Sequence, residues 1–235
     1  FRETVKTTVS ICVMGLYSAG KSAFINALIG EEIMPSASDP TTAKTYRVSS
    51  SEQSKIHFQY NGKDINLLFS GNKYAPQVAA QLNDNELLTS IKQAIESSGS
   101  DLQSVHMYRA LQVINEFEGK TARPNVISDV IDVEVPFIHS SLALDEFDYV
   151  IYDTPGSNSA SNKRHMEILQ EALKGQTNGL PIFLTTPDTM DSKDNNEIID
   201  IIDQMAGALD RTNTMVIVNR ADEKDSETLE SKKKA

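Results

Sequence analysis

The stretch from Gly15 to Ser22, which reads GLYSAGKS, constrains the fold more than any other part of the chain. It fits the phosphate-binding pattern G-x-x-x-x-G-K-[ST], known as the P-loop. Two glycines allow the backbone to turn tightly enough to aim several N–H groups at one phosphate. Lys21 adds a positive charge for the β and γ phosphates, and the hydroxyl of Ser22 can ligate Mg²⁺.

The segments on either side of this loop support the interpretation. Residues 9–14 form a short apolar run that is typical of a buried strand. Residues 23–29 carry apolar side chains at helical spacing, and Gly30 is a usual C-terminal signal for a helix. Strand, loop and helix therefore follow in the required order, and the positive end of the helix also attracts an anion. The alternative is a glycine-rich turn that binds nothing.

Length and charge limit the architecture and the partners. The chain has 235 residues and a net charge of −11. That length suits one large α/β domain or two small ones, and we favour one because the motifs span nearly the whole chain. Nucleic acids and anionic membranes attract basic patches, so an acidic chain argues against both as direct partners. We expect no nucleic-acid partner.

The single cysteine bears on the cellular compartment, and the two ends of the sequence bear on whether the chain is a fragment. Cys12 has no second cysteine with which to form an internal disulfide, which favours a reducing, cytoplasmic compartment. No run approaches the roughly 20 apolar residues of a membrane span. The sequence starts at Phe1 and stops on a lysine run, so we expect a fragment of a longer protein.

A second motif, Asp153-Thr154-Pro155-Gly156, follows the short apolar run 149–152. An acid at the end of a buried strand can hold Mg²⁺ through water, and a backbone N–H in the turn can meet the γ phosphate. Earlier in the chain, the polar loop 31–40 ends in Thr41 and Thr42. A nucleotide switch needs a hydroxyl that reaches Mg²⁺ only while the γ phosphate is present.

A third motif, Asn219-Arg220-Ala221-Asp222, follows the apolar run 214–218. A carboxylate at Asp222 can accept both the N1–H and the exocyclic amine of guanine, a pair of donors that adenine lacks. The usual pattern has Lys where this chain has Arg220. The planar guanidinium of Arg can stack on a base in place of the Lys stem.

The remaining segments show strand or helix patterns. Strands are predicted for residues 44–50, 55–60, 63–69, 126–137 and 181–184. Helices are predicted for residues 75–96, 102–117, 163–173 and 194–209. Asn61-Gly62 is a strong signal for a hairpin turn between two of these strands.

With these motifs in place, the chain resembles the dynamin superfamily of large GTPases, especially bacterial dynamin-like proteins. The stretches GLYSAGKSAFINALIGEEIMP, PTTA, YDTPG and VNRAD are similar to that family's consecutive motifs, from about Val9 to Asp222. The resemblance implies an α/β P-loop GTPase domain with a mostly parallel central sheet flanked by helices. Residues 1–235 would form this one domain, with a hairpin-plus-helix insertion at about 60–125 between the two switches.

The resemblance also implies roles for individual residues. The nucleotide-binding residues would be Gly15, Tyr17, Ser18, Ala19, Gly20, Lys21, Ser22, Asn219, Arg220 and Asp222. Mg²⁺ would be held by Ser22, Thr42 and Asp153. The residues expected to act in catalysis are Ser18, Lys21, Thr42 and Gly156. Ser18 would help bind a monovalent cation, K⁺ or Na⁺, and Asp191 would reach across a dimer of GTPase domains.

The resemblance further implies what the whole protein does. Its substrate would be GTP and its products GDP and phosphate, with a homodimer forming through the GTPase domains across the nucleotide. This dimer would drive membrane remodelling, with the stalk and the membrane-binding regions outside this chain. The location would be cytoplasmic, or peripheral at the inner face of a membrane.

Two departures from the family pattern open alternatives. Tyr17 stands where classical dynamins carry a Gln that orients the attacking water, and Ser157 stands where Ras-like enzymes carry theirs. Hydrolysis would then depend on backbone groups, a cation or a partner domain. A second hypothesis is therefore a GTP-regulated binding scaffold with negligible hydrolysis. A third is a P-loop ATPase or kinase in which Asn219 and Asp222 have no role in choosing the base.

Overall fold

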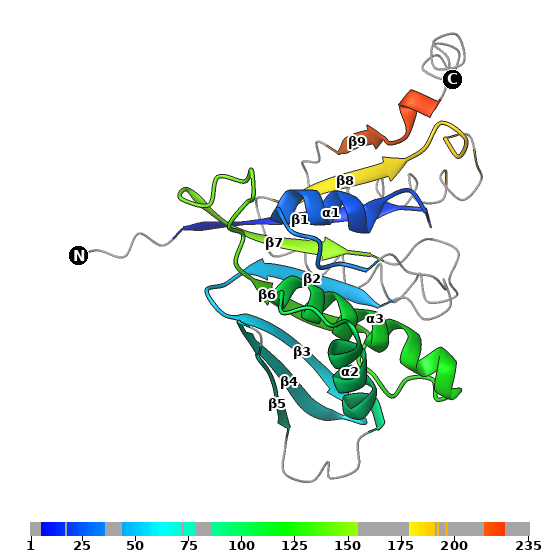
Figure 1. The fold of residues 1–235 in the computed structure, drawn as a ribbon. Coiled ribbons are helices and arrows are strands. Elements are labelled where there is room, and N and C mark those ends of the chain that lie inside the picture. Colours follow the sequence, from blue (N-terminus) through cyan, green and yellow to red (C-terminus); the bar gives the residue numbers. More distant parts are fainter. Residues whose placement is uncertain are drawn as a thin grey trace.

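The computed structural model describes residues 6–16, 18–35, 44–71, 73–78, 86–154, 179–190, 192, 196 and 214–223. These residues form a nine-stranded sheet with the strand order β5-β4-β3-β6-β2-β7-β1-β8-β9 (Figure 1). The strands are β1 Thr7–Gly15, β2 Thr45–Ser50, β3 Ser54–Tyr60, β4 Lys63–Ser70, β5 Lys73–Val78, β6 Val130–Val135, β7 Phe147–Asp153, β8 Gly179–Thr185 and β9 Met215–Val218. The helices are α1 Lys21–Ile29, α2 Glu86–Ser97 and α3 Gln103–Thr121, followed by the 3-10 turn η2 Ala221–Glu223.

The sheet is mixed, so the expectation of a mostly parallel sheet is wrong. Strand β1 pairs in parallel with β7 and β8, and β8 pairs in parallel with β9. Strand β2 runs antiparallel to β7, and β3, β4 and β5 add antiparallel pairings beyond β6. Among the described strands, four of the eight pairings are therefore antiparallel. Three of these pairings arise because the hairpins between residues 54 and 78 extend the central sheet, and the fourth is that of β2 with β7.

The parallel half places several strand ends at one edge. The last six residues of β1 are buried, because parallel strands in the middle of a sheet are covered on both faces. Strands β7, β1, β8 and β9 run in the same direction and finish at Asp153, Gly15, Thr185 and Val218. The carboxyl edge of such a sheet is where ligands bind in open α/β folds.

The antiparallel half follows the alternation of its sequence. In β3, Ile56, Phe58 and Tyr60 are buried, while the residues between them are half-buried or exposed. The predicted hairpin turn is confirmed: Asn61 and Gly62 have φ values of 51° and 72°, and Tyr60 pairs with Lys63. Positive φ at both central residues is the requirement of a type I′ turn, which Asn-Gly meets well.

The helix predicted over residues 75–96 is wrong in its first part. Residues 73–78 form the strand β5, and α2 begins at Glu86. Pro76 has no N–H to donate, and the structure places it on β5, which ends the strand order. The ring of Tyr74 packs 5.7 Å from that of Phe69 on β4, a tertiary contact that helical spacing does not reveal. The helices predicted over 163–173 and 194–209 lie outside the described residues.

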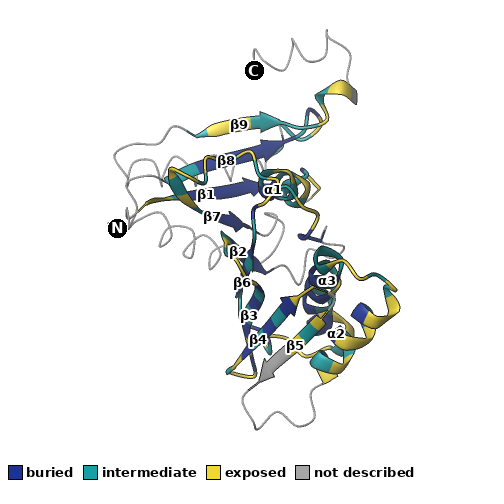
Figure 2. Ribbon diagram, turned by 60° about the vertical axis from the view of Figure 1, so that its left-hand side comes forward, coloured by how far each residue is buried: buried dark blue, intermediate teal, exposed yellow. Residues whose placement is uncertain are grey.

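Helices α1, α2 and α3 lie on one face of the sheet (Figure 1, Figure 2). Their buried side chains join those of the strands in one hydrophobic cluster. The largest contributions from α3 come from Met107, Leu111, Ile114 and Phe117. Fully burying one such side chain contributes about 1.5–3 kcal/mol, so α3 is an integral part of the core. None of the described helices is both long enough and apolar enough to cross a membrane.

Asn26 fixes the path of the chain as it leaves α1. Its side-chain oxygen accepts bonds from the N–H groups of Ile33 (3.0 Å) and Met34 (2.8 Å), and its amide donates to the carbonyl of Met34 (3.0 Å). Both Ile33 and Met34 are buried. One polar side chain therefore satisfies three backbone groups of a buried segment that water does not reach.

Replacing Asn26 by Ala is expected to lower the free energy of unfolding by about 2 kcal/mol, because two buried N–H groups lose their acceptor. Asn26→Asp is the companion variant: it keeps the acceptor oxygen, loses the donor to Met34 and adds a negative charge beside the Met34 carbonyl. Urea unfolding of both variants measures the difference. An Ala variant as stable as the wild type would show that these acceptor bonds contribute nothing.

Candidate functional site

The backbone of the P-loop is shaped by two glycines in close contact with other strands' ends. Gly15 ends β1 with φ +150°, and a Cβ there would lie 2.2 Å from the carbonyl oxygen of Leu184 on β8. Gly20 has φ +95°, and a Cβ there would lie 2.3 Å from Nδ2 of Asn219. Both positions therefore require glycine for conformation, and Gly15 also requires it for space, because the atom that a Cβ would meet there belongs to the backbone. Between them, Ser18 also has a positive φ of 65° and is exposed.

Lys21 begins α1 and turns its side chain back over the loop. Its ammonium nitrogen donates to the carbonyls of Gly15 (2.9 Å) and Leu16 (3.0 Å). Burial lowers the pKa of Lys21, and the nearby carboxylate of Asp153 partly offsets this by favouring the charged form. The positive charge is thus held against the loop at the place where the P-loop pattern expects a phosphate.

Asp153 and Ser22 bring two side-chain oxygens together beside this lysine. The Ser22 hydroxyl, in the first turn of α1, donates to Oδ2 of Asp153 at the end of β7 (3.4 Å). Burial raises the pKa of Asp153 to about 6, although Lys21 and the bond from Ser22 act in the opposite direction. A buried carboxylate next to a hydroxyl is a donor set that fits Mg²⁺, a hard cation that prefers oxygen.

Thr154, which sequence reasoning did not assign a role, fixes the end of β7. Its N–H (3.4 Å) and its hydroxyl (3.0 Å) both donate to the carbonyl of Val13 on β1. The motif DTPG thus contains a residue that holds the adjacent Asp153 level with the P-loop. A threonine directly after a predicted metal ligand at a strand end was the available signal.

Asn219 connects the third motif to the P-loop. Its N–H donates to the carbonyl of Thr185 (2.8 Å), and its side-chain amide donates to the carbonyl of Ala19 (2.9 Å). Its side-chain oxygen accepts a bond from the N–H of Arg220 (2.9 Å). Arg220 has a positive φ of 56° and is exposed, and Asp222 follows in η2, also exposed. The first residue of the third motif is therefore hydrogen-bonded to the loop that precedes Lys21.

The structure brings most of the predicted site residues to one edge of the sheet, near the strand ends labelled β7, β1, β8 and β9 in Figure 1. The predicted residues that it describes are Gly15, Ser18, Ala19, Gly20, Lys21, Ser22, Asp153, Asn219, Arg220 and Asp222. Those that lie outside the described residues are Tyr17, Thr42, Gly156, Ser157 and Asp191. Their roles stay predictions.

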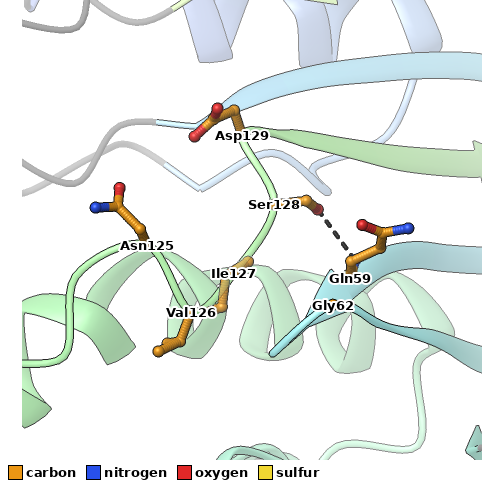
Figure 3. A pocket seen from close by; sticks show the side chains of 7 residues that line it. All are labelled: Gln59, Gly62, Asn125, Val126, Ile127, Ser128 and Asp129. Carbon is orange, nitrogen blue, oxygen red and sulfur yellow. Dashed lines mark hydrogen bonds between the residues drawn. The ribbon is translucent and has the colours of Figure 1, made fainter.

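A separate hollow lies at the turn between β3 and β4. It has a volume of about 330 Å³ and is lined by Gln59, Gly62, Asn125, Val126, Ile127, Ser128 and Asp129. Figure 3 shows the side chains of Gln59 and Asn125 pointing to opposite sides, while the N–H of Gln59 donates to the Ser128 hydroxyl (3.0 Å). None of the three motifs contributes to this lining, so the chemistry favours the P-loop edge as the functional site.

Comparison with known proteins identifies the family. A model of the dynamin family matches residues 11–221, which is most of the chain. The chain belongs to the dynamin family. This confirms the resemblance inferred from the motifs, and the matched residues correspond to the family's GTPase domain.

Individual proteins of this family that are similar to the chain share a quarter or less of its residues. Dynamin-like protein A of Bacillus subtilis (strain 168) is 25% identical over 203 residues, which cover 74% of this chain and 16% of the relative. The chain thus spans about a sixth of that relative's length. Two solved structures of an oligomerised bacterial dynamin pair, described as sensing and tethering membranes over long range, are 16% and 15% identical. Each match covers 95% of this chain and 27% of the other, with TM-scores of 0.45 and 0.44.

The raised pKa of Asp153 predicts a pH dependence in Mg²⁺-free solution. The folded state keeps the proton up to about pH 6, whereas the unfolded carboxyl releases it near its ordinary pKa of 3.8. The folded state therefore binds more protons in this window, and the free energy of unfolding falls as pH rises through it. Asp153→Asn should remove this slope and, at pH 7, be more stable than the wild type by as much as about 3 kcal/mol.

The measurement is urea unfolding of both proteins between pH 4 and pH 7 with a chelator present. Asn can still accept the bond from Ser22, so the comparison isolates the charge. Parallel pH profiles for the two proteins would contradict the prediction.

Proposed function

We propose that this chain binds GTP and hydrolyses it to GDP and phosphate with the help of Mg²⁺. The observation that carries the proposal is the hydrogen bond from the Asn219 side chain to the carbonyl of Ala19. It holds Asn219, the first residue of the motif that would select the base, against the loop that would bind the phosphates, so that one nucleotide can meet both. Membership of the dynamin family, whose members are large GTPases, supports the same conclusion.

On the phosphate side, the loop supplies its N–H groups and the charge of Lys21. Gly15 and Gly20 permit the tight path of the backbone, and α1 offers the positive end of its dipole. Ser22 and Asp153 would hold Mg²⁺ together with Thr42. Mg²⁺ held there would supply positive charge that stabilises the negative charge developing on the phosphates. Gly156 would donate its N–H to the γ phosphate.

On the base side, Asp222 would accept the two donors on the edge of guanine. The exposed Arg220 beside it can lie over the face of the base. Their position after Asn219, which is tied both to Thr185 and to Ala19, supports this assignment. In an ATPase or kinase, a carboxylate at this position would not contact the base. Substitution of Asp222 therefore distinguishes the GTPase hypothesis from the ATPase or kinase hypothesis.

For the hydrolytic step, the chain would rely on groups other than a glutamine. Tyr17 and Ser157 stand at the two positions where related enzymes carry a water-orienting side chain. A homodimer that forms across the nucleotide, with Asp191 reaching the partner and Ser18 helping to hold K⁺ or Na⁺, would complete the site. In the cell, we propose that this cycle drives membrane remodelling from the cytoplasmic side, through regions outside this chain.

The same two positions favour one alternative, a GTP-regulated binding scaffold with negligible hydrolysis. In that case GTP would still order the loops that contain Thr42 and Gly156, and partner binding would follow without turnover. Nucleotide affinity alone does not separate the two functions, because both bind GTP. Turnover does.

Phosphate release from GTP, with ATP measured in parallel, tests the proposal at a series of protein concentrations in potassium buffer. We expect release from GTP only, with turnover per molecule rising with concentration because two domains complete each other's sites. A sodium buffer and a lithium buffer serve as controls for the cation. If GTP binds but turnover stays near zero at every protein concentration, the chain acts as a GTP-regulated binding scaffold and the hydrolysis proposal is wrong.

Asp222→Asn tests the choice of base. The variant should lose about 10- to 100-fold in affinity for GDP, because buried donors of guanine that lose their acceptor cost about 1–3 kcal/mol. Its affinity for ADP should stay the same. Asp188→Asn, at an acid in the turn after β8 that is not in the motif, is the control. Unchanged affinity of Asp222→Asn for GDP would rule out Asp222 as the guanine acceptor.

A further inference from the structure

A buried ion pair ties α3 to the residue that precedes β2. The ammonium of Lys44 lies 2.8 Å from Oε2 of Glu118, and these side chains are only 6% and 8% exposed. Lys44 also donates to the carbonyl of Ile127 (3.0 Å), while Oε1 of Glu118 accepts from the N–H of Ile127 (2.8 Å). Each charge therefore has a partner of opposite sign and a backbone partner, which is the condition for burying it.

A second polar contact lies one helical turn away along the same face of α3. The hydroxyl of Tyr46 on β2 donates to the side-chain oxygen of Asn115, and Tyr46 is buried. Asn115 and Glu118 are three residues apart on the helix, so they face the same way. Lys44 and Tyr46 are two residues apart at the start of β2, so they also share a face. Two neighbouring residues at the start of β2 thus contact two neighbouring residues on one face of α3: Lys44 pairs with Glu118, and Tyr46 pairs with Asn115.

Two polar contacts in an apolar layer have a geometric consequence. The surrounding side chains Ile114 and Phe117 of α3 are apolar, and packed helices held by apolar contacts alone can undergo small sliding motions. A hydrogen-bonded ion pair does not, because moving it leaves a buried charge unpaired. The pairs thus specify where β2 lies along its axis relative to α3.

The start of β2 is next to the candidate magnesium site. Tyr46 is the register partner of Asp153 in the antiparallel pairing of β2 with β7. Lys44 follows Thr42, the predicted switch threonine, by two positions in the sequence. A contact that fixes Lys44 and Tyr46 therefore acts on the strand that borders Asp153 and on the chain that leads from Thr42.

We propose that Glu118 and Asn115 of α3 are positioning residues for the magnesium and γ-phosphate side of the nucleotide site. They act through Lys44 and Tyr46, and they touch neither the nucleotide nor the metal. This inference rests on the proposed function, since it concerns the same GTP site. Its consequence is that α3 couples to the affinity for GTP more strongly than to the affinity for GDP, which has no γ phosphate.

Two variants test the proposal without leaving a buried charge alone. Lys44→Met with Glu118→Gln removes both charges while the glutamine oxygen can still accept from Ile127. Tyr46→Phe removes the hydroxyl that bonds Asn115 and keeps the ring. Lys120→Met is the matched control, because Lys120 pairs with Glu116 on the exposed side of the same helix.

The measurement is the ratio of two affinities: that for a non-hydrolysable GTP analogue with Mg²⁺, and that for GDP without Mg²⁺. We expect the ratio to fall by at least about fivefold in the double variant, by less in Tyr46→Phe, and not at all in Lys120→Met. Thermal unfolding is recorded alongside. A merely structural role would lower the melting temperature and leave the ratio unchanged.

The outcomes separate this inference from the proposed function. If the wild type binds neither guanine nucleotide, the proposed function fails. If the wild type binds both and the ratio is unchanged in the double variant and in Tyr46→Phe, the positioning role is overturned while the GTP site stands. A ratio that falls equally in Lys120→Met would also overturn it, because the effect would then belong to α3 in general.

Discussion

The parallel pairing of β1 with β7 on one side and β8 on the other is the constraint on which the candidate site depends. Because these strands run in the same direction, they finish at the same edge, and the side chains that follow them are brought together. Asp153 and Lys21 are neighbours for this reason, although 131 positions separate Asp153 from Ser22, its hydrogen-bond partner. The close contact of Gly15 with Leu184 belongs to the same pairing, since only a residue without a side chain fits between the strands.

Burial of charged groups at this edge of the sheet destabilises the folded protein. Asp153 is 6% exposed, and burial raises its pKa despite a lysine and a hydroxyl nearby. Without a cation, the carboxylate therefore destabilises the folded protein at neutral pH. Lys21 experiences the complementary effect, since burial lowers its pKa. Such desolvated groups of opposite charge are typical of functional sites, where an anion beside the lysine and a cation beside the carboxylate would stabilise their charged forms.

The sequence predicts the local features of this molecule better than its tertiary contacts. The P-loop, the Asn61-Gly62 turn and the strand runs around them are determined by residues close together in the chain, so their patterns are visible. Strand β5 was missed because its place depends on pairing with β4, and Pro76 does not reveal that it lies at an edge. The hydrogen bond from the Asn219 side chain to the Ala19 carbonyl spans 200 positions, and no local sequence pattern predicts it. The mixed sheet escaped prediction for the same reason, since strand direction is a property of pairing.

The antiparallel half of the sheet gains a role from this arrangement. Hairpins attached only through apolar packing would add stability and leave the site unaffected. Here β3 pairs with β6, β6 with β2, and β2 with β7, so the hairpins continue into the strand that ends at Asp153. Helix α3 covers this half and reaches β2 through Glu118 and Asn115. We therefore expect a shift of these hairpins or of α3 to reach β2 through hydrogen bonds, which tolerate little change in length or direction, and to pass from β2 to the border of Asp153.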